Sequence, residues 1–160
     1  MLAKPTAAIF VDVQNIYYTT REAYNRNFDY NVLWRELESQ FTLQHSYAYA
    51  IASKQEKQRQ FHHILRGIGF EVKLKPFTQR SDGTTKGDWD VGIALDVFET
   101  ASQVDTIVLL SGDGDFDVLA QRIKQRFNVE VVVYSVEQLT AQSLIDQADR
   151  YVAIEDRLLL

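Results

Sequence analysis

Short apolar runs alternate with longer stretches of helical periodicity along most of the chain. Residues 7–11 form an apolar run without polar alternation, as expected of a strand buried on both faces. The same pattern predicts further strands at 46–52, 70–77, 106–110, 129–134 and 151–154, and helices at 30–41, 54–67, 88–101, 116–127 and 139–147. Strands separated by helices of this length favour right-handed βαβ units and a mostly parallel sheet.

The run at 70–77 differs from the other predicted strands because apolar Phe70, Val72 and Leu74 alternate with charged residues. This alternation is typical of a half-exposed strand at a sheet edge. An exposed edge invites pairing with another strand, so this edge is the candidate surface for a homodimer, while the sequence leaves the oligomeric state open. The stretch that follows, 78–87, is the least hydrophobic part of the chain and is predicted to be a loop.

The whole chain, 1–160, is predicted to form one domain, because it shows no linker and no internal repeat. The expected fold class is α/β, with a single doubly wound, mostly parallel sheet flanked by helices. No apolar run approaches the roughly 18 residues that a membrane span needs, so no membrane partner is expected. The chain has no cysteine, which excludes disulfides and thiol catalysis and suits the reducing cytoplasm.

Several aspartates lie where predicted strands end or predicted helices begin. They are Asp12 after the first strand, Asp88 and Asp90 at the start of the helix at 88–101, and Asp113, Asp115 and Asp117 after the strand at 106–110. In a doubly wound sheet, sites form outside the carboxyl ends of the strands, where the strand order reverses. The first strand and the strand at 106–110 are natural neighbours across such a point. We therefore expect Asp12 and Asp113 to face each other there.

Carboxylates gathered in this way cannot all stay ionised without a positive charge between them. Oxygen ligands select hard divalent cations, so the expected ion is Mg²⁺ or Mn²⁺. No histidine lies among these acids, which argues against zinc. Such an ion can polarise a phosphoryl oxygen and activate water. The competing interpretation is helix capping, because Asp88, Asp115 and Asp117 all sit where an N-cap belongs. Capping explains one aspartate well but explains three separate clusters poorly.

Other side chains carry weaker signals. Tyr17, Tyr18 and Tyr24 follow the first strand and could stack nucleic-acid bases, although packing beneath a loop is the commoner role. His62 and His63 are predicted to lie on the surface of a helix. The net charge of −5 counts against a protein that coats nucleic acid by charge alone.

Three motifs together resemble the NYN domain, a family of PIN-like nucleases, and are closest to its LabA-like bacterial branch. They are Phe10-Val11-Asp12-x-x-Asn15, then Lys86-Gly87-x-x-Asp90-Val91-x-Ile93-Ala94-x-Asp96, and finally Ser111-Gly112-Asp113-Gly114-Asp115-Phe116. They occur in the family's order, and the resemblance covers essentially the whole chain. The resemblance implies a Rossmann-like PIN fold and a Mg²⁺- or Mn²⁺-dependent ribonuclease whose substrate is RNA.

The resemblance also assigns roles to individual residues. Asp12, Asp90 and Asp113 match the acidic metal-binding positions, with Asp115 as a fourth, Asn15 matches a residue that orients the metal or phosphate, and Ser111 matches a small hydroxyl residue beside the acids. Asp96 matches a recurrent acid, but six helical residues separate it from Asp90, a rotation of roughly 240°. We therefore expect Asp96 to lie outside the ligand set.

In addition, Lys86 and Arg80 of the polar loop are expected to hold the backbone phosphates of the RNA. Two departures from the family pattern stand out. Val13-Gln14 occupies the place where many relatives carry glycine, and the extra acids Asp88 and Asp117 oppose tight RNA binding. An inactive regulatory module on the same fold is the main alternative to a nuclease. A phosphatase for small phosphoesters is a third hypothesis, which lacks a recognisable nucleophile motif.

Overall fold

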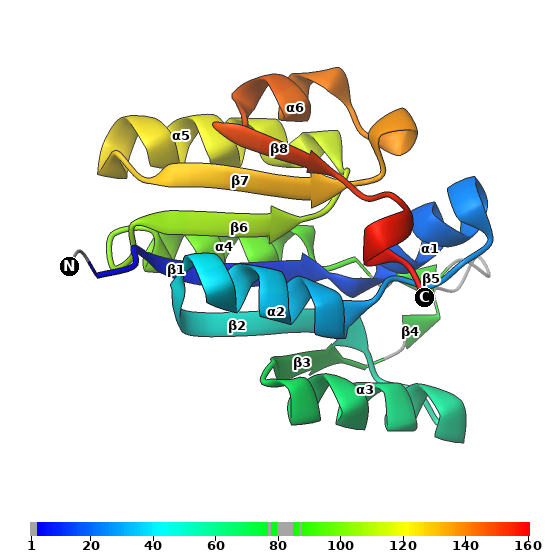
Figure 1. The fold of residues 1–160 in the computed structure, drawn as a ribbon. Coiled ribbons are helices and arrows are strands. Elements are labelled where there is room, and N and C mark those ends of the chain that lie inside the picture. The colour runs from blue at the N-terminus through cyan, green and yellow to red at the C-terminus, as the bar shows by residue number, and fades with distance from the viewer. Residues whose placement is uncertain (1–2, 77, 80–84, 87) are drawn as a thin grey trace.

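A computed structural model describes residues 3–76, 78–79, 85–86 and 88–160 of the chain (Figure 1). The helices and strands are β1 (Thr6–Asp12), α1 (Val13–Tyr24), α2 (Tyr30–Gln40), β2 (Thr42–Ile51), α3 (Glu56–Ile68), β3 (Glu71–Lys75), β4 (Thr78–Gln79), β5 (Thr85–Lys86), α4 (Asp90–Thr100), β6 (Thr106–Leu110), η1 (Gly114–Phe116), α5 (Asp117–Phe127), β7 (Glu130–Ser135), η2 (Glu137–Leu139), α6 (Gln142–Gln147), β8 (Arg150–Ala153) and η3 (Asp156–Leu158).

Six of the strands form one sheet in the order β3-β2-β1-β6-β7-β8, and every pairing in it is parallel. The chain fills the sheet outward from β1 to β3, then returns to the other side of β1 and continues from β6 to β8. The strand order therefore reverses between β1 and β6. This is the switch point at which doubly wound sheets place their sites.

The sheet is covered on both faces, and each face has its own hydrophobic core. In β1 the side chains of Ile9 and Val11 join the core beneath α1, α2 and α3, whereas Ala8 and Phe10 join the core beneath α4 and α5. Figure 1 shows α2 in front of the sheet and α4 and α5 behind it. This doubly wound α/β architecture, consistent with a PIN-like fold, confirms the predicted fold class.

Helix α1 follows β1 without a break and was not predicted. Its buried residues, Val13, Ile16 and Thr20, recur at helical spacing. Tyr17 and Tyr18 lie on its outer side, with 47% and 63% of their surfaces exposed, so packing beneath a loop is the wrong role for both. Tyr24 does pack, and its hydroxyl donates a hydrogen bond of 2.9 Å to the Ile154 carbonyl oxygen.

The predicted edge strand is confirmed, because β3 lies at one end of the sheet. The polar segment at 78–87 was predicted to be a loop throughout, but β4 and β5 pair in it as two short antiparallel strands. The prediction for His62 was also wrong. His62 lies on the buried side of α3 and is 4% exposed, whereas the adjacent His63 is exposed. No helix in the described ranges is long and apolar enough to cross a membrane.

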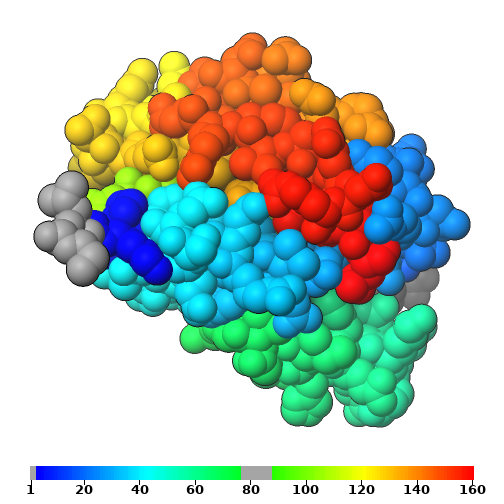
Figure 2. Space-filling model, in the orientation of Figure 1, coloured from blue at the N-terminus to red at the C-terminus, as the bar shows by residue number. Residues whose placement is uncertain are grey.

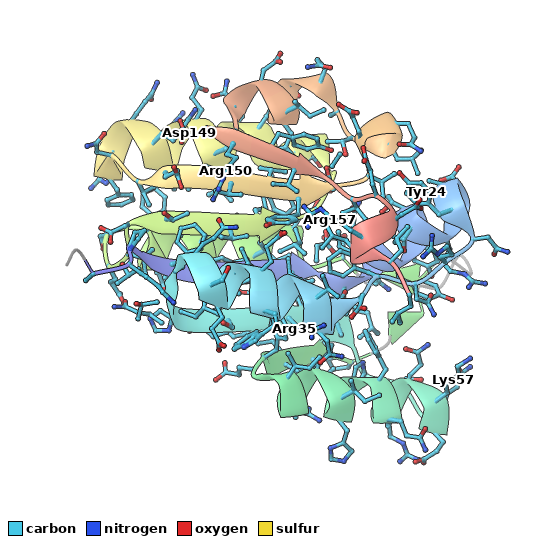
Figure 3. The ribbon with its side chains drawn as sticks, in the orientation of Figure 1. Tyr24, Arg35, Lys57, Asp149, Arg150 and Arg157 are labelled. Carbon is cyan, nitrogen blue, oxygen red and sulfur yellow. The ribbon has the colours of Figure 1, made fainter. Side chains whose placement is uncertain are left out.

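The C-terminal segment packs on the α2 side of the sheet, where Figure 2 shows it beside α1 and α2. Glu36 of α2 accepts a hydrogen bond of 2.6 Å from the Tyr134 hydroxyl and forms an ion pair with Arg157. Arg35, Arg150 and Arg157 all project on this face (Figure 3), and the Arg150 guanidinium lies 5.8 Å from the Phe41 ring. These contacts cover the α2 side of the sheet. The acids lie elsewhere, at the carboxyl ends of the strands.

Candidate metal centre

Asp12 is the last residue of β1 and caps the start of α1. One carboxylate oxygen, Oδ1, accepts a hydrogen bond of 3.4 Å from the Asn15 backbone N–H, and Oδ2 accepts one of 3.1 Å from the Ser111 hydroxyl. The side chain is buried, and burial raises the pKa of Asp12 to about 6, with Asp113 and Asp88 adding repulsion. The carboxylate is therefore costly to keep ionised without a nearby positive charge.

Ser111 and Asn15 join the ends of the two central strands. Ser111 follows β6, and its oxygen accepts a hydrogen bond of 3.2 Å from the Asp113 N–H while its hydroxyl donates to Asp12. Asn15 accepts a hydrogen bond of 2.9 Å from the Gly112 N–H through Oδ1. A Cβ on Gly112 would lie 2.8 Å from the Thr140 hydroxyl oxygen, so a larger residue would force this loop away. These contacts tie the loop that carries Asp113 to the end of β1, where Asp12 lies.

The start of α4 is fixed by Trp89, whose importance the sequence did not indicate. Its indole N–H donates a hydrogen bond of 2.8 Å to the Ala50 carbonyl oxygen, and its ring contacts Tyr49 with centroids 5.2 Å apart. The ring lies so close to Gly92 that a Cβ there would approach it to 2.6 Å. A glycine three residues after a tryptophan was the only signal in the sequence. The tryptophan anchor sets the position of the adjacent Asp90.

Asp90, Asp113 and Asp115 come together at this edge. Each contributes one carboxylate oxygen, and these oxygens all lie within 4.8 Å of one another. The pKa of Asp90 is raised to about 7, first because of burial and then because of its hydrogen bond with Asp113 and the charge of that residue. No salt bridge in the described part of the chain reaches these three side chains. An all-carboxylate donor set of this kind fits a hard divalent cation.

The remaining predicted residues fall into three groups. Asp12 lies outside the set of three oxygens but is linked to Asp113 through Ser111. Asp96 is held elsewhere, because its Oδ2 accepts hydrogen bonds of 2.8 Å from the Tyr49 hydroxyl and 2.7 Å from the Lys73 ammonium group. Asp96 is therefore not part of the cluster of three acids. Arg80 and the side chain of Lys86 lie outside the described residues.

Helix capping accounts for some of the acids but not for the cluster. Asp12 caps α1, and Asp113 caps η1 through a hydrogen bond of 2.9 Å from the Asp115 N–H to its Oδ1. Asp88 accepts a hydrogen bond of 3.3 Å from the Asp90 N–H, but Trp89 is the N-cap residue of α4 and no side chain caps that helix, so Asp88 is not its cap. The capping role considered for Asp115 and Asp117 is wrong, since Phe116 is the N-cap residue of α5 and no side chain caps that helix.

Comparison with known proteins places this geometry in a family. The sequence model of the NYN domain matches residues 6–155. The chain belongs to the NYN domain family. It is similar to "Low amplitude and bright protein LabA" of Synechococcus elongatus, with 30% identity over 160 residues that cover 93% of this chain and 83% of LabA.

A solved structure is similar to this chain in both sequence and fold. The crystal structure of VPA0982, a protein of unknown function from Vibrio parahaemolyticus, is 59% identical and superposes with a TM-score of 0.95 over 100% of both chains. NYN domains are nuclease-like, and NYN and PIN-like nucleases generally use divalent metals. The acid cluster of this NYN domain lies at the switch point of the sheet, where a site is expected.

Proposed function

We propose that this NYN domain is a ribonuclease that hydrolyses RNA phosphodiester bonds with Mg²⁺ or Mn²⁺ held by Asp90, Asp113 and Asp115. The observation that carries the proposal is the convergence of these carboxylate oxygens within 4.8 Å. When bound, the cation supplies Lewis-acid stabilisation of the phosphoryl group and a more acidic water molecule. A bound cation would offset the cost of burying these acids and their mutual repulsion, because its positive charge favours the ionised carboxylates.

The residues around the cluster hold it in position. Asp12 faces Asp113 and adds a fourth carboxylate, oriented by the Ser111 hydroxyl at 3.1 Å. Asn15 fixes the loop after β6 by accepting a hydrogen bond from Gly112 at 2.9 Å. Rigid support of this kind is what metal ligands need, because their orientation controls both affinity and activity. Lys86 and Arg80 remain our proposed contacts to the phosphates of the RNA.

The wider setting completes the proposal. We expect one NYN domain over 1–160, working in the cytoplasm on an RNA substrate. The outer edge of β3 stays our expected pairing site for a second copy of the chain.

The test is cleavage of an end-labelled single-stranded RNA with Mn²⁺, by the wild-type chain and by Asp90→Asn. Loss of a residue that only supports a metal ligand already costs about 10- to 100-fold in affinity or activity, so loss of a ligand should cost at least about 100-fold. Asp146→Asn is the matched control, since Asp146 is an exposed aspartate on α6. Equal cleavage by wild type and Asp90→Asn would contradict the proposal.

Two other outcomes would favour the alternatives. RNA binding without cleavage by the wild type would favour an inactive regulatory or RNA-binding module on the same fold. Metal-dependent hydrolysis of p-nitrophenyl phosphate with the RNA left intact would favour a phosphatase.

A further inference from the structure

A groove between α4 and α5 begins at the acid cluster. Its first part has a volume of about 290 Å³ and is lined by Asp90, Val91, Ala94, Asp115, Phe116 and Leu119. Its second part has a volume of about 660 Å³ and shares Ala94, Asp115 and Leu119 with the first. The shared lining makes the two hollows one continuous groove that leads away from the acids.

The walls of the groove are apolar and exposed. Leu95 and Phe98 of α4 are 60% and 39% exposed, and Val118 of α5 is 54% exposed. Isolated exposed apolar residues need no explanation, but a contiguous group on a monomer indicates a binding surface.

Two arginines stand at the far part of the groove. Arg122 and Arg126 are one helical turn apart on α5, a rise of roughly 6 Å. None of the salt bridges found within the described ranges includes either of them. The Arg126 guanidinium lies 5.9 Å from the Phe98 ring, which is the arrangement of a cation–π pair.

The direction of the groove follows from the fold. Both α4 and α5 start at the carboxyl edge of the sheet and run back along the same face (Figure 1). Asp90 and Phe98 are eight residues apart on α4, so the groove extends roughly 12 Å from the acids. It therefore has carboxylates at one end, an apolar middle and arginines at the other end.

We propose that this groove binds the RNA nucleotides next to the phosphate held at the acid cluster. A base would pack between Leu95, Phe98 and Val118, and the next phosphate would meet Arg122 and Arg126. Bases stack on aromatic side chains and on guanidinium planes, and arginine binds phosphate through paired hydrogen bonds. This subsite rests on the proposed function, because it assumes that a phosphate of an RNA substrate lies at the acid cluster.

The charges favour RNA over a second protein chain as the occupant. Arg122 and Arg126 line the groove without a carboxylate partner among the described residues, and as neighbours one turn apart on α5 they can approach the same phosphate. A protein covering the groove would also stand against Asp90 and Asp115, which line its entrance. RNA bound in the groove would reach the acid cluster, where the proposed cation would offset the repulsion between these acids and a phosphate.

The experiment measures binding separately from cleavage. Anisotropy of a fluorescein-labelled oligouridylate is recorded in EDTA with the full chain, so that no metal-dependent cleavage occurs. The variants are Arg122→Glu and Phe98→Ala, and the matched control is Arg35→Glu, an exposed arginine on the opposite face (Figure 3). A stacked base contributes about 10-fold to affinity, and each phosphate contact adds about one unit to the slope of the salt dependence.

We expect Arg122→Glu and Phe98→Ala each to weaken binding about 10-fold, Arg122→Glu to reduce the salt slope, and Arg35→Glu to bind within about 2-fold of wild type. Unchanged binding by both groove variants would overturn the subsite, and so would a parent chain that does not bind the RNA. A dimer in sedimentation that Leu95→Glu dissociates, with RNA binding unaffected, would overturn it in favour of a protein interface. Cleavage is measured in a separate assay. RNA binding in the groove of a chain that does not cleave RNA would contradict the proposed nuclease activity and support the subsite.

Discussion

Replacing Asp12 by Asn should stabilise the metal-free protein at alkaline pH. The ionised Asp12 carboxylate is buried beside other acids, and its pKa is raised from 3.8 to about 6. A carboxyl group with a raised pKa binds its proton more tightly in the folded state. The stability that it contributes is therefore fully present below pH 3.8 and is lost as the pH rises through about 6.

The size of the effect follows from the pKa difference. The interval between 3.8 and about 6 corresponds to about 3 kcal/mol between the two protonation states. The hydrogen bonds from Asn15 and Ser111 lower the pKa of Asp12, and the value of about 6 already includes their effect. Asn at position 12 removes the charge and keeps one acceptor oxygen, so it resembles the protonated carboxyl group rather than the carboxylate. For a chain of this length we expect a rise in melting temperature of about 6–12 °C at pH 8 as an upper limit.

The measurement is the free energy of unfolding in urea for wild type and Asp12→Asn, in EDTA, at pH 8 and at pH 4. The advantage of the variant should shrink from up to about 3 kcal/mol at pH 8 to below about 1 kcal/mol at pH 4. Asp146→Asn, which changes an exposed aspartate, should shift the unfolding free energy by less than about 0.5 kcal/mol at either pH.

Added Mn²⁺ should reduce the advantage of the variant at pH 8. A ligand at 100 times its dissociation constant stabilises the folded state by about 2.7 kcal/mol, and Asp12→Asn should gain less than the wild type. An Asp12→Asn variant that is no more stable than wild type at pH 8, or equally more stable at both pH values, would refute the reasoning.

Other variants separate the parts of the site. Ser111→Ala should destabilise the chain by about 1–3 kcal/mol in urea unfolding and weaken Mn²⁺ binding about 10-fold, because it removes a buried hydrogen-bond partner of Asp12; normal Mn²⁺ affinity would rule out a supporting role. Asp96→Asn should cost about 1 kcal/mol through its bond to Lys73 yet leave the Mn²⁺-induced melting shift unchanged, and a lost shift would make Asp96 a ligand. Gly112→Ala should lower the unfolding free energy by about 1–3 kcal/mol, since its Cβ would meet a hydroxyl oxygen at 2.8 Å; an unchanged value would show that the loop adapts.

The sequence indicated the edge of the sheet at which the acids gather, because several of them lie at strand ends. Apolar runs marked β1 and β6, and their parallel, adjacent placement brought Asp12 and Asp113 to one edge. Asp90 was predicted through its motif, although its proximity to Asp113 depends on how α4 packs. Helix α1 escaped prediction because Tyr17 and Tyr18 lie on its outer face and obscured the helical spacing of its buried residues.

The supports of the site were harder to predict because they depend on contacts between distant residues. Trp89 is held by Ala50 and Tyr49, which lie about forty residues earlier, so no local pattern marks it. His62 follows the same principle, since its helix turns it toward the domain although the sequence around it is polar. The groove between α4 and α5 likewise arises from the packing of two helices.

The most direct measurement is a Mn²⁺ titration followed by electron paramagnetic resonance, in which the signal of free Mn²⁺ falls as the ion binds. Wild type and Asp113→Asn would be compared at pH 8, with Asp146→Asn as the charge-matched control. If the three carboxylates form a cation site, the wild type and the control bind Mn²⁺ and Asp113→Asn binds it at least about 10-fold more weakly. Equal Mn²⁺ binding by all three proteins would contradict a metal site at this cluster.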